Sequence, residues 1–501
     1  MQQPGVPRPT LVRPVRLSAL ADGALRGADV EVTGITSGTG FVRPGDLFAA
    51  LPGTRTHGAA HVPDALAAGA VAVLTDEAGA ALLEQDLPLL VVDDVRRVLG
   101  PISARVYEDP SRQMSVLGVT GTSGKTTTTF LLRAGLVAAG HVPGLIGTVA
   151  TMIGEDEVKT GFTTPEAPEV HALLAVMRER GVTHVAMEVS SHALAMGRAD
   201  GVSFAVAAFT NLSEDHLDFH DDMEDYFAAK AKLFDAGRSR AAVVVVDDAW
   251  GVRLTETVPG PVATVTTIGE RRATWEASAI TDQPDGSTTF RIVGPDADLA
   301  AGCAVPGRYN VANAALALAM LHEVGVAPAV AALAIARASV PGRMERVDAG
   351  QRFLAVVDYS HKPAAVDGAL RALRPRTPAR VIVVLGWGGD RDRGKRPHMG
   401  EIAARGADLL IVTDDNPRSE DPAAIRRAML DGALAVPADE RGEVREVGDR
   451  AAAIAVAVAA AGEGDTVLVA GKGHETGQEI AGVVHPFDDR VVLRAALEAA
   501  R

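Results

Sequence analysis

A glycine-rich segment between a predicted strand and a predicted helix is the first place where residue types and spacing point to chemistry. The strand Ser115–Thr120 runs into a loop and a helical pattern with the residues Gly121, Thr122, Ser123, Gly124, Lys125, Thr126 and Thr127. Glycines let backbone N–H groups approach phosphate oxygens, and a helix N-terminus adds the positive end of its dipole. Lys125 can reach the β- and γ-phosphates, and the Thr126 hydroxyl can bind Mg²⁺. The segment predicts an ATP-binding loop; the alternative is a tight strand–helix turn without a ligand.

The glycine spacing of this loop departs from the widespread G-x-x-x-x-G-K-T pattern. That pattern would need a glycine at position 119, where the chain has Val119, and the glycine stands at position 121 instead. The glycine at position 121 distinguishes this loop from that of most P-loop proteins and indicates a smaller group of nucleotide-binding proteins.

A lysine on the apolar face of a predicted helix is the second candidate. The segment Tyr226–Phe234 has a helical pattern, and the residues three or four positions from Lys230 are Tyr226, Phe227, Leu233 and Phe234. Lys232 points about 200° away, at about 100° per residue, and is expected on the solvent side. Burial lowers the pKa of a lysine and yields a neutral amine, which can take up CO₂. The alternative is a lysine whose stem packs while its amine reaches water.

Four polar motifs in the C-terminal part of the chain each follow a predicted strand. The strands are Phe353–Val357, Arg380–Leu385, Leu409–Thr413 and Thr466–Ala470, and the motifs begin at Asp358, Gly386, Asp415 and Gly471. Ligands of open α/β sheets bind just outside the carboxyl ends of the strands. We therefore predict that these four loops form one pocket. Trp387, in the second loop, either narrows that pocket or stacks on adenine.

Strand and helix patterns alternate along most of the chain and predict an α/β protein of three domains. Polar turns near Tyr107–Ser111 and at Pro341–Arg343 place the domains at residues 1–108, 109–342 and 343–501. The central domain is expected to be a doubly wound sheet carrying the P-loop, with a Rossmann-like C-terminal domain and a smaller N-terminal α/β domain. Further expected elements are strands at Thr183–Val189, Val202–Phe209 and Ala241–Val246, a strand- and turn-rich stretch at Gly260–Ala304 and a helix at Arg308–Val324.

Composition excludes several classes of protein. The 501 residues carry a net charge of −15, so the basic surface typical of nucleic-acid binding is absent. Cys303 is the only cysteine, which excludes an intrachain disulfide and suits a reducing compartment. The first ten residues lack the apolar core of a signal peptide, and the apolar stretch Ala451–Ala461 is shorter than the ~20 residues of a membrane span. We predict a cytoplasmic monomer that neither binds nucleic acid nor inserts into a membrane.

Five stretches, in order along the chain, resemble the Mur ligase family. They are Gly121–Thr127, Met187–Leu194, Thr210–Asp218, Pro306–Asn313 and Asp358–Pro363, and the resemblance extends from about residue 34 to the C-terminus. Members of this family join amino acids to a UDP-linked muramic acid in peptidoglycan synthesis. They transfer the γ-phosphoryl group of ATP to a carboxylate, and an amine then attacks the acyl phosphate. Thr163-Thr-Pro and Asp415-Asn-Pro-Arg match the members that add 2,6-diaminopimelate to UDP-MurNAc-L-Ala-D-Glu.

The resemblance implies a set of catalytic, metal-binding and ATP-binding residues. Catalysis falls to Lys125, Glu188, His216 and Lys230, and Mg²⁺ to Thr126, Glu188, His216 and a CO₂-derived carbamate on Lys230. Asn313, Arg343 and Asp358 join the phosphate loop in binding ATP. His220 has no counterpart and is expected to be a surface or structural histidine. Glu188 could instead be a capping or solvated residue.

The resemblance also implies two groups of substrate contacts. Thr39, Thr163, Thr164, Ser190 and Arg198 match positions that hold the UDP-linked substrate, although the chain has Gly38 and Gly40 where the family often has an acid and an arginine. Hydroxyls and an arginine suit phosphate and carboxylate oxygens; each could also be a helix cap or a surface charge. Diaminopimelate falls to Arg391, Asp415, Asn416, Pro417, Arg418, Gly471 and Glu475. The arginines suit its carboxylates, and Asn416 and Glu475 suit an ammonium.

The reaction predicted from these residues is the ATP-dependent addition of meso-2,6-diaminopimelate. The LL isomer presents the same groups with one centre inverted, and the motifs do not separate the two. One alternative is a sibling ligase that adds D-glutamate or a dipeptide, or a relative of folylpolyglutamate synthase; the motifs at Thr163 and Asp415 argue against it. Another is a P-loop switch protein without ligase activity, against which stand the metal residues and the separate C-terminal pocket.

Overall fold

The chain divides into two compact units. The structure, a computed structural model, describes residues 6–53, 55–84, 86–269, 271–283 and 286–500. The first unit comprises Met1–Ser278, Ile292–Leu299 and Ala312–Ala334, and the second comprises Ala279–Arg291, Ala300–Val311 and Ile335–Arg501. Within the described ranges, no helix is both long and apolar enough to cross a lipid bilayer.

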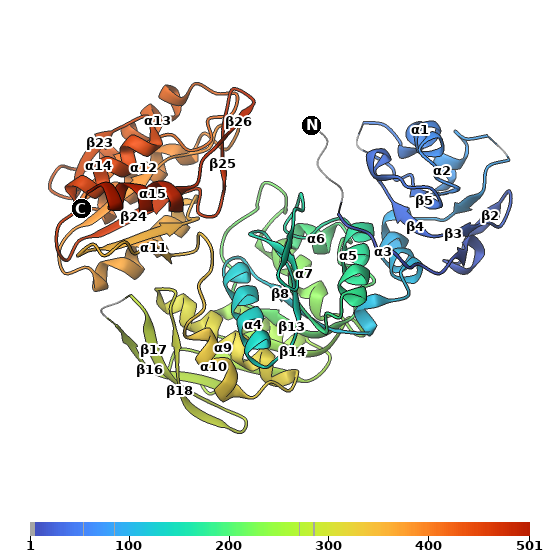
Figure 1. Cartoon of the computed structure of the whole chain (residues 1–501), viewed down its shortest axis with the longest axis horizontal. Helices are drawn as coiled ribbons and strands as arrows, with labels where there is room; N and C mark the ends of the chain where they lie inside the picture. The colour runs from blue at the N-terminus through green and yellow to red at the C-terminus, as the bar shows by residue number, and fades with distance from the viewer. Residues whose placement is uncertain (1–5, 54, 85, 270, 284–285, 501) are drawn as a thin grey trace. The chain divides into compact units, whose positions relative to one another are not determined.

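The N-terminal part of the first unit is a small α/β layer built on a five-stranded sheet (Figure 1, blue). The strand order is β2-β7-β6-β5-β4, with β4 to β7 parallel and β2 antiparallel at the edge. Its elements are β1 (Val15–Arg16), β2 (Ala24–Arg26), β3 (Glu31–Val32), β4 (Gly34–Thr36), β5 (Asp46–Ala49), α1 (Val62–Ala67), β6 (Ala72–Thr75), α2 (Glu77–Ala80), β7 (Leu89–Val91) and α3 (Val95–Val106). Ile35 and Leu47 share a buried cluster with Ala172 and Ala175 of α5 (Ala167–Glu179), so this layer packs on that helix.

A mostly parallel sheet surrounds β8 in the middle of the first unit. The strand order begins β11-β10-β9-β12-β8-β13-β14-β15-β16, with β10 and β11 antiparallel and the others parallel. The strands are β8 (Ser115–Thr120), β9 (Pro143–Ile146), β10 (Thr151–Ile153), β11 (Asp156–Val158), β12 (His184–Glu188), β13 (Phe204–Phe209), β14 (Ser239–Val245), β15 (Val262–Thr266) and β16 (Trp275–Asp282). Every expected strand of this region is confirmed, with ends moved by at most two residues.

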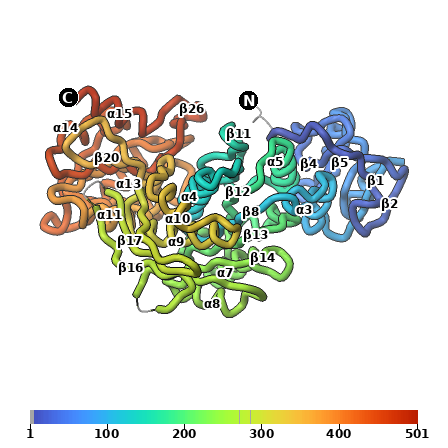
Figure 2. The backbone as a smooth tube through the Cα atoms, turned by 60° about the horizontal axis from the view of Figure 1, so that its bottom comes forward, coloured from blue at the N-terminus to red at the C-terminus, as the bar shows by residue number. Residues whose placement is uncertain are grey.

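The strand order reverses beside β8, because β9 and β12 lie on one side of it and β13 to β15 on the other. A doubly wound sheet binds ligands at such a switch point, and the glycine-rich loop follows β8 directly. The helices of this region are α4 (Lys125–Ala138), which packs on β12, β9 and β8, α6 (Ser191–Ala195), α7 (Met223–Ala231) and α8 (Ala249–Thr257), which packs beside β14 (Figure 2). Asp222 caps the N-terminus of α7, and Asp248 caps that of α8.

The stretch Gly260–Ala304 is rich in strands, as expected. It holds β15, β16, β17 (Thr288–Gly294) and β18 (Ala297–Cys303), and the division between the two units runs through it. The helices that follow are α9 (Arg308–Glu323), at the expected position, and α10 (Pro328–Ile335). Cys303 is buried, and burial raises the pKa of its thiol to about 11.

The rest of the second unit is a six-stranded sheet with order β19-β20-β24-β21-β22-β23, parallel except for β19 at its edge. Its strands are β19 (Glu345–Arg346), β20 (Leu354–Asp358), β21 (Val381–Leu385), β22 (Leu409–Val412), β23 (Glu443–Glu446) and β24 (Thr466–Ala470). The helices are α11 (Pro363–Leu373), α12 (Lys395–Gly406), α13 (Pro422–Ala435), α14 (Arg450–Ala460) and α15 (Asp489–Ala499), and a hairpin of β25 (Gly477–Ile480) and β26 (Val483–Pro486) precedes the last helix.

The central strands of this sheet are apolar throughout because both of their faces are covered. Alternate residues such as Val357, Val384 and Val469 share one buried cluster with Ile454 of α14 and Leu493 of α15, since successive side chains of a strand point to opposite faces. Four neighbouring strands, β20, β24, β21 and β22, end at the same edge. The four polar loops that the sequence placed after these strands therefore emerge side by side.

Candidate functional site

The phosphate loop keeps a conformation that only glycine allows at two positions. Gly121 has φ +140° and Gly124 has φ +91°, and side chains rarely adopt such values. A Cβ at Gly121 would collide with the Thr210 hydroxyl, and a Cβ at Gly124 with the Asn313 side-chain oxygen. Asn313, expected to bind ATP, therefore lies against the loop. The displaced glycine at position 121 is required by the packing of the loop.

The segment after β13 holds the phosphate loop in place. Thr210 donates a hydrogen bond to the Ser123 carbonyl at 2.6 Å. Asn211 receives one from the Ser123 amide at 3.1 Å and donates another to the Ser123 carbonyl. The Asn211 carbonyl also accepts the Thr122 amide at 2.9 Å. Thr210 and Asn211 open the Thr210–Asp218 motif but were not predicted as site residues.

Lys125 and Lys230 both reach the carbonyls of this loop. Lys125, the first residue of α4, donates from its ammonium to the Gly121 and Thr122 carbonyls at 2.7 and 2.9 Å. Lys230 donates to the Gly121 carbonyl at 2.8 Å. Lys230 is only 1% exposed, whereas Lys232 is exposed. The expected burial of Lys230 is confirmed.

Tyr226 connects Lys230 with His216. The Lys230 ammonium lies 4.3 Å from the centre of the Tyr226 ring, and the His216 ring lies 6.1 Å from it. The Tyr226 hydroxyl is within 3.2 Å of the Thr122 hydroxyl, and burial raises the pKa of Tyr226 above its usual value. His216 has a left-handed backbone, φ +54°, which a rigid surrounding must stabilise. Lys230, His216 and the phosphate loop are thus brought together.

His220 is a structural histidine. Its side chain is 1% exposed, and Nδ1 lies 2.8 Å from an Asp225 carboxylate oxygen. Its ring packs on Tyr226 and Phe219. The neighbouring His192 stacks on Phe219 at 4.1 Å, and burial lowers the pKa of His192. The structural alternative for His220 therefore matches its surroundings.

Glu188 ends β12 beside the phosphate loop, because it pairs with Val119 of β8. The residue is 1% exposed. Both of its carboxylate oxygens accept hydrogen bonds from Thr148, one from the backbone amide at 2.9 Å and one from the hydroxyl at 3.0 Å. Glu188 is therefore neither a helix cap nor a solvated surface acid. Thr148 lies 40 positions from Glu188 and was not predicted as a site residue.

Four residues expected to hold the UDP-linked substrate gather around the end of β12. The Thr163 hydroxyl is 2.9 Å from that of Thr148. Thr164 donates to the Glu188 carbonyl at 2.9 Å and accepts the Ser190 amide at 3.3 Å. Ser190 caps α6. Arg198 pairs with Glu166 at 2.9 Å and reaches the Thr164 carbonyl.

Thr39 lies apart from that group, in a 3-10 helix of the N-terminal layer, Thr39–Phe41. A cavity of about 170 Å³ adjoins this turn and is lined in part by Thr36, Gly40, Arg43 and Glu169 of α5. Arg8 crosses the same place and pairs with Asp46 at 2.6 Å. Two basic residues, Arg8 and Arg43, thus line the cavity beside the Thr39 turn.

In the second unit, the loops after β20 and β24 surround Tyr359. Asp358, expected to bind ATP, accepts the backbone amides of Met344 at 2.6 Å and Ser360 at 2.9 Å. The guanidinium of Arg343 lies 4.3 Å from the centre of the Tyr359 ring. The pKa of Tyr359 is raised, first by burial and then by the negative charges of Glu475 and Asp415.

A buried lysine occupies the place where the sequence predicted an ammonium site. Lys472 is 0% exposed, and its ammonium donates to Asn416 at 2.9 Å and to Glu475 at 3.2 Å, with Asp415 at 3.8 Å. Asn416 also accepts the Glu479 amide at 3.0 Å and donates to Glu475 at 2.8 Å. The Asn416 oxygen is therefore already used by two donors. Lys472 directly follows Gly471, the first residue of the fourth predicted loop, and was not predicted as a site residue.

The two arginines expected to bind carboxylates meet at Gly388. A Cβ there would lie 3.0 Å from Arg418 and 3.7 Å from Arg391. Arg418 has φ +53° and donates to the Gly389 carbonyl at 2.6 Å. A Cβ at Gly389 would collide with the Pro417 carbonyl. The loops after β21 and β22 are thus in direct contact.

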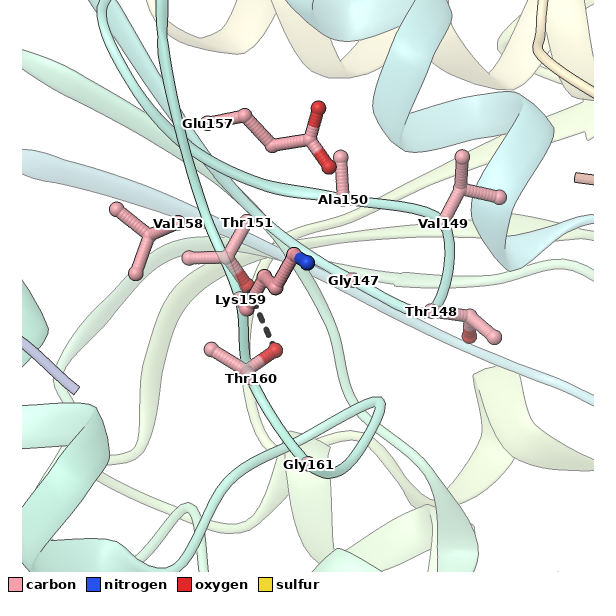
Figure 3. A pocket seen from close by; sticks show the side chains of 10 residues that line it. All are labelled: Gly147, Thr148, Val149, Ala150, Thr151, Glu157, Val158, Lys159, Thr160 and Gly161. Atoms are coloured by element: carbon pink, nitrogen blue, oxygen red, sulfur yellow. Dashed lines mark hydrogen bonds between the residues drawn. The ribbon is translucent and has the colours of Figure 1, made fainter. Parts of the chain in front are cut away.

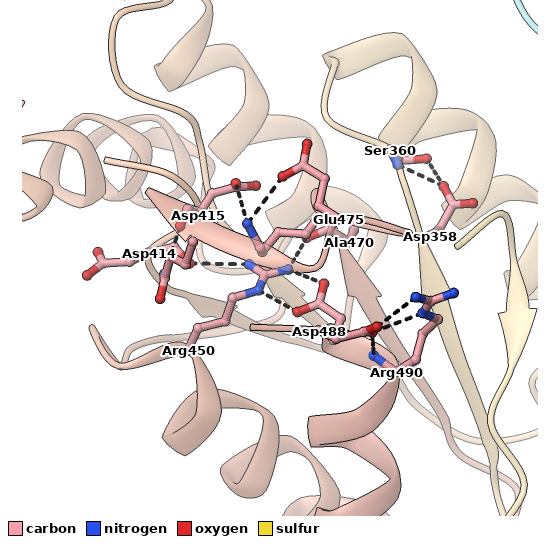
Figure 4. Close-up of polar contacts among 12 residues, drawn as sticks. Asp358, Ser360, Asp414, Asp415, Arg450, Ala470, Glu475, Asp488 and Arg490 are labelled. Atoms are coloured by element: carbon pink, nitrogen blue, oxygen red, sulfur yellow. Dashed lines mark hydrogen bonds and ion pairs between the residues drawn. The ribbon is translucent and has the colours of Figure 1, made fainter. Parts of the chain in front are cut away.

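Three other features complete this part of the second unit. Arg450 and Asp489 form a fully buried pair with two contacts of 2.7 Å, and Arg450 also donates to the Ala470 carbonyl at 2.9 Å (Figure 4). A Cβ at Gly471, which has φ +117°, would approach Asp415 at 2.5 Å. Trp387 is 7% exposed, so most of its ring packs inside the domain. Short contacts thus link the loop after β24 to those after β20 and β22, and the loop after β22 to that after β21.

Comparison with known proteins gives three family matches along the chain. The Mur ligase family catalytic domain matches residues 31–107, the Mur ligase middle domain residues 119–321, and the Mur ligase glutamate ligase domain residues 342–473.

Individual relatives match over nearly the whole chain. The chain is 53% identical to a UDP-N-acetylmuramoyl-L-alanyl-D-glutamate–2,6-diaminopimelate ligase of Streptomyces avermitilis, over 99% of both chains. It is 54% identical to a ligase of the same name from Corynebacterium efficiens, over 94% of this chain and 91% of that one. A solved structure of a ligase with that name covers 97% of this chain and 99% of its own, with 29% identity and a TM-score of 0.72.

Proposed function

Because this chain belongs to the Mur ligase family, we propose that it adds meso-2,6-diaminopimelate to UDP-N-acetylmuramoyl-L-alanyl-D-glutamate with ATP, in peptidoglycan biosynthesis. Relatives with 53% and 54% identity carry the name of this activity. The observation that carries the proposal is the buried Lys230 ammonium, 2.8 Å from a carbonyl of the phosphate loop. This contact joins the phosphate loop with its displaced Gly121 to the buried lysine. These are the two features that separate the proposed ligase from other P-loop proteins.

The reaction divides into two steps whose atoms balance. A carboxylate oxygen of the glutamate attacks the γ-phosphorus of ATP, the bond to the β-phosphate oxygen breaks, and ADP leaves. The amine of diaminopimelate then attacks the acyl carbon and expels phosphate, and its proton passes to solvent or a nearby base. Phosphoryl transfer needs positioning and positive charge more than covalent help. Lys125 and the loop amides provide this charge, and Asn313, Arg343 and Asp358 are proposed to bind the nucleotide with them.

Mg²⁺, when bound, would neutralise charge on the transferring phosphoryl group. Thr126, Glu188, His216 and Lys230 are the residues proposed to hold it. Among the described residues, no three His, Cys, Asp or Glu side chains form a group that could bind a metal. A carbamate on Lys230 would add a carboxylate-like ligand to Glu188 and His216. The position fits, because a carbamylated lysine keeps one N–H to donate to the Gly121 carbonyl.

The amino acid is proposed to bind in the second unit. Arg391 and Arg418, which meet at Gly388, suit the distal carboxylate, since an arginine can bind a carboxylate with two parallel hydrogen bonds. Asn416 and Glu475, together with Asp415, are proposed to line the site of the distal ammonium. The close approach of Pro417 to Gly389 joins the loops after β22 and β21, and that of Gly471 to Asp415 joins the loops after β24 and β22. This pairing of charges would favour diaminopimelate over lysine, which lacks the distal carboxylate.

The remaining proposals concern organisation. We propose domain boundaries near residues 108 and 342, which the gaps between the three family matches support. The UDP-linked substrate is proposed to extend from Thr39 in the N-terminal layer to Thr163, Thr164, Ser190 and Arg198. The enzyme is proposed to act as a monomer in the cytoplasm.

One assay separates the alternatives. The protein is incubated with ATP, Mg²⁺ and the UDP-linked dipeptide, and phosphate release is followed with a panel of acceptors: diaminopimelate isomers, lysine, D-glutamate and D-alanyl-D-alanine. Release that requires meso-diaminopimelate is the expected result. Release without any acceptor would indicate a nucleotide switch, and release with lysine but not diaminopimelate would overturn the proposed specificity.

A further inference from the structure

Among the described residues, Thr148 is the one hydrogen-bond partner of the Glu188 side chain, and it donates to both carboxylate oxygens. It lies in the connection between β9 and β10, directly after Gly147. A Cβ at Gly147 would collide with a Glu188 oxygen, so the glycine is what lets this connection close over the acid. Thr148 borders a cavity of about 260 Å³ lined by residues 147–151 and 157–161 (Figure 3).

The direction of the hydrogen bonds in this group follows from counting hydrogens. A carboxylate only accepts, so the Thr148 hydroxyl, 3.0 Å from Glu188, is the donor of that bond. A hydroxyl has one hydrogen. The contact of 2.9 Å between the Thr148 and Thr163 hydroxyls must therefore use the hydrogen of Thr163. The chain of donors runs from Thr163 to Thr148 to Glu188.

This order leaves the Thr163 oxygen with lone pairs only. Toward a ligand it is an acceptor, and phosphate or carboxylate oxygens, which the sequence analysis expected it to hold, offer it no hydrogen. The neighbouring Thr164 hydroxyl has other partners, because it donates to the Glu188 carbonyl and accepts a hydrogen bond from the Ser190 amide. A group that can satisfy Thr163 must bring an N–H or O–H.

We propose that Thr148 is a positioning residue that fixes Thr163 as the acceptor for the amide N–H between alanine and glutamate in the UDP-linked substrate. The inference rests on the proposed function, because the substrate is taken from it. Of the N–H groups of that substrate, this amide adjoins the glutamate whose carboxylate reacts, and Glu188 ends the strand beside the phosphate loop. The same chain of hydrogen bonds would fix the position of the substrate's peptide bond relative to Glu188.

The test is a matched pair of variants measured by binding without ATP or Mg²⁺. Thr148→Val keeps the shape and the backbone amide but removes the hydroxyl, which frees the Thr163 hydrogen. Thr148→Ser keeps the hydroxyl and is the control. By calorimetry, we expect Thr148→Val to weaken binding of the UDP-linked dipeptide about fivefold, the usual worth of one hydrogen bond, and Thr148→Ser to stay within about twofold.

A substrate analogue identifies the group that Thr163 accepts. With an ester in place of the alanine–glutamate amide, the wild-type protein should bind about fivefold more weakly, whereas Thr163→Val should bind amide and ester alike. Equal binding of both analogues by the wild type, or equal binding of the dipeptide by Thr148→Val and wild type, overturns the inference and leaves the proposed function standing. A wild-type protein that binds no UDP-linked dipeptide overturns the proposed function itself.

Discussion

Replacing Gly121 by alanine should disable the phosphate loop, and the chain contains its own control. Gly121 has φ +140°, and a Cβ there would collide with the Thr210 hydroxyl. Gly140 also has a positive φ, +83°, but a Cβ there would meet nothing within 4 Å. Gly140→Ala therefore measures backbone strain alone, and Gly121→Ala measures strain together with the displacement of Thr210.

The size of the effect follows from the contacts that Thr210 makes. A left-handed backbone costs a non-glycine residue about 1–2 kcal/mol. Displaced, the Thr210 hydroxyl loses its bonds to the Ser123 carbonyl at 2.6 Å and the Thr120 carbonyl at 3.3 Å, each worth about 0.5–1.5 kcal/mol. The binding-competent loop is therefore disfavoured by about 2–5 kcal/mol. At about 1.4 kcal/mol per tenfold, the lower limit corresponds to about a 30-fold loss of ATP affinity.

The assay is ATP affinity by calorimetry together with thermal unfolding of both variants. If the altered loop moves to another conformation, ATP binding weakens at least about 30-fold. If the loop keeps the binding-competent conformation, the same free energy is lost from the stability of the folded protein. Gly140→Ala should keep wild-type ATP affinity and lose only the strain contribution, about 1–2 kcal/mol of stability. The reasoning is refuted if Gly121→Ala matches Gly140→Ala in both measurements.

Three other perturbations test separate parts of the account. Arg418→Ala should raise the KM for diaminopimelate at least about tenfold, as expected for loss of a charge-assisted hydrogen bond, with the KM for ATP unchanged; equal losses in both would contradict its assignment. Lys230→Ala should abolish ligation, and wild-type activity should fall when bicarbonate and CO₂ are removed; a variant as active as the wild type at low bicarbonate would exclude the carbamate. Burial lowers the pKa of His171 from 6.5 to about 4, so the stability that its neutral form contributes is present above pH 6.5 and is lost as pH falls toward 4, by on the order of 3 kcal/mol. His171→Gln should therefore lose less melting temperature than the wild type between pH 8 and 5, and an equal loss would show that His171 does not govern this range.

Sequence patterns predicted those parts of the fold in which the surroundings of a residue depend on residues close to it in the sequence. The run Thr466–Ala470 does not alternate between apolar and polar residues, which indicates a strand buried on both faces. It forms β24 with the expected ends. The side of the helix on which Lys230 lies follows from the 3.6-residue period, and its burial is confirmed. The hairpin strands β11 and β26 were not predicted. Their exposed residues show little apolar alternation, and their pairing depends on the opposite strand.

The parts of the site that were not predicted depend on contacts between distant residues. Thr148 reaches Glu188 across 40 positions, and Lys472 reaches Asn416 across 56. A threonine in a loop and a lysine between two glycines carry no local sign of such partners. Motif matching did assign Asn416 to the site, but its oxygen proves to be used by Lys472 and the Glu479 amide. Which atom a side chain offers to a ligand is decided by its other hydrogen bonds, and these are visible only in the fold.

The central claim is that the γ-phosphoryl group of ATP passes to a carboxylate of the UDP-linked substrate. The most direct measurement labels the glutamate carboxylates of that substrate with ¹⁸O and follows the isotope during ligation of diaminopimelate. An acyl phosphate intermediate leaves one carboxylate oxygen on the phosphate, so the released phosphate should carry one ¹⁸O from the substrate. Unlabelled phosphate, formed by attack of water on ATP, would contradict the account.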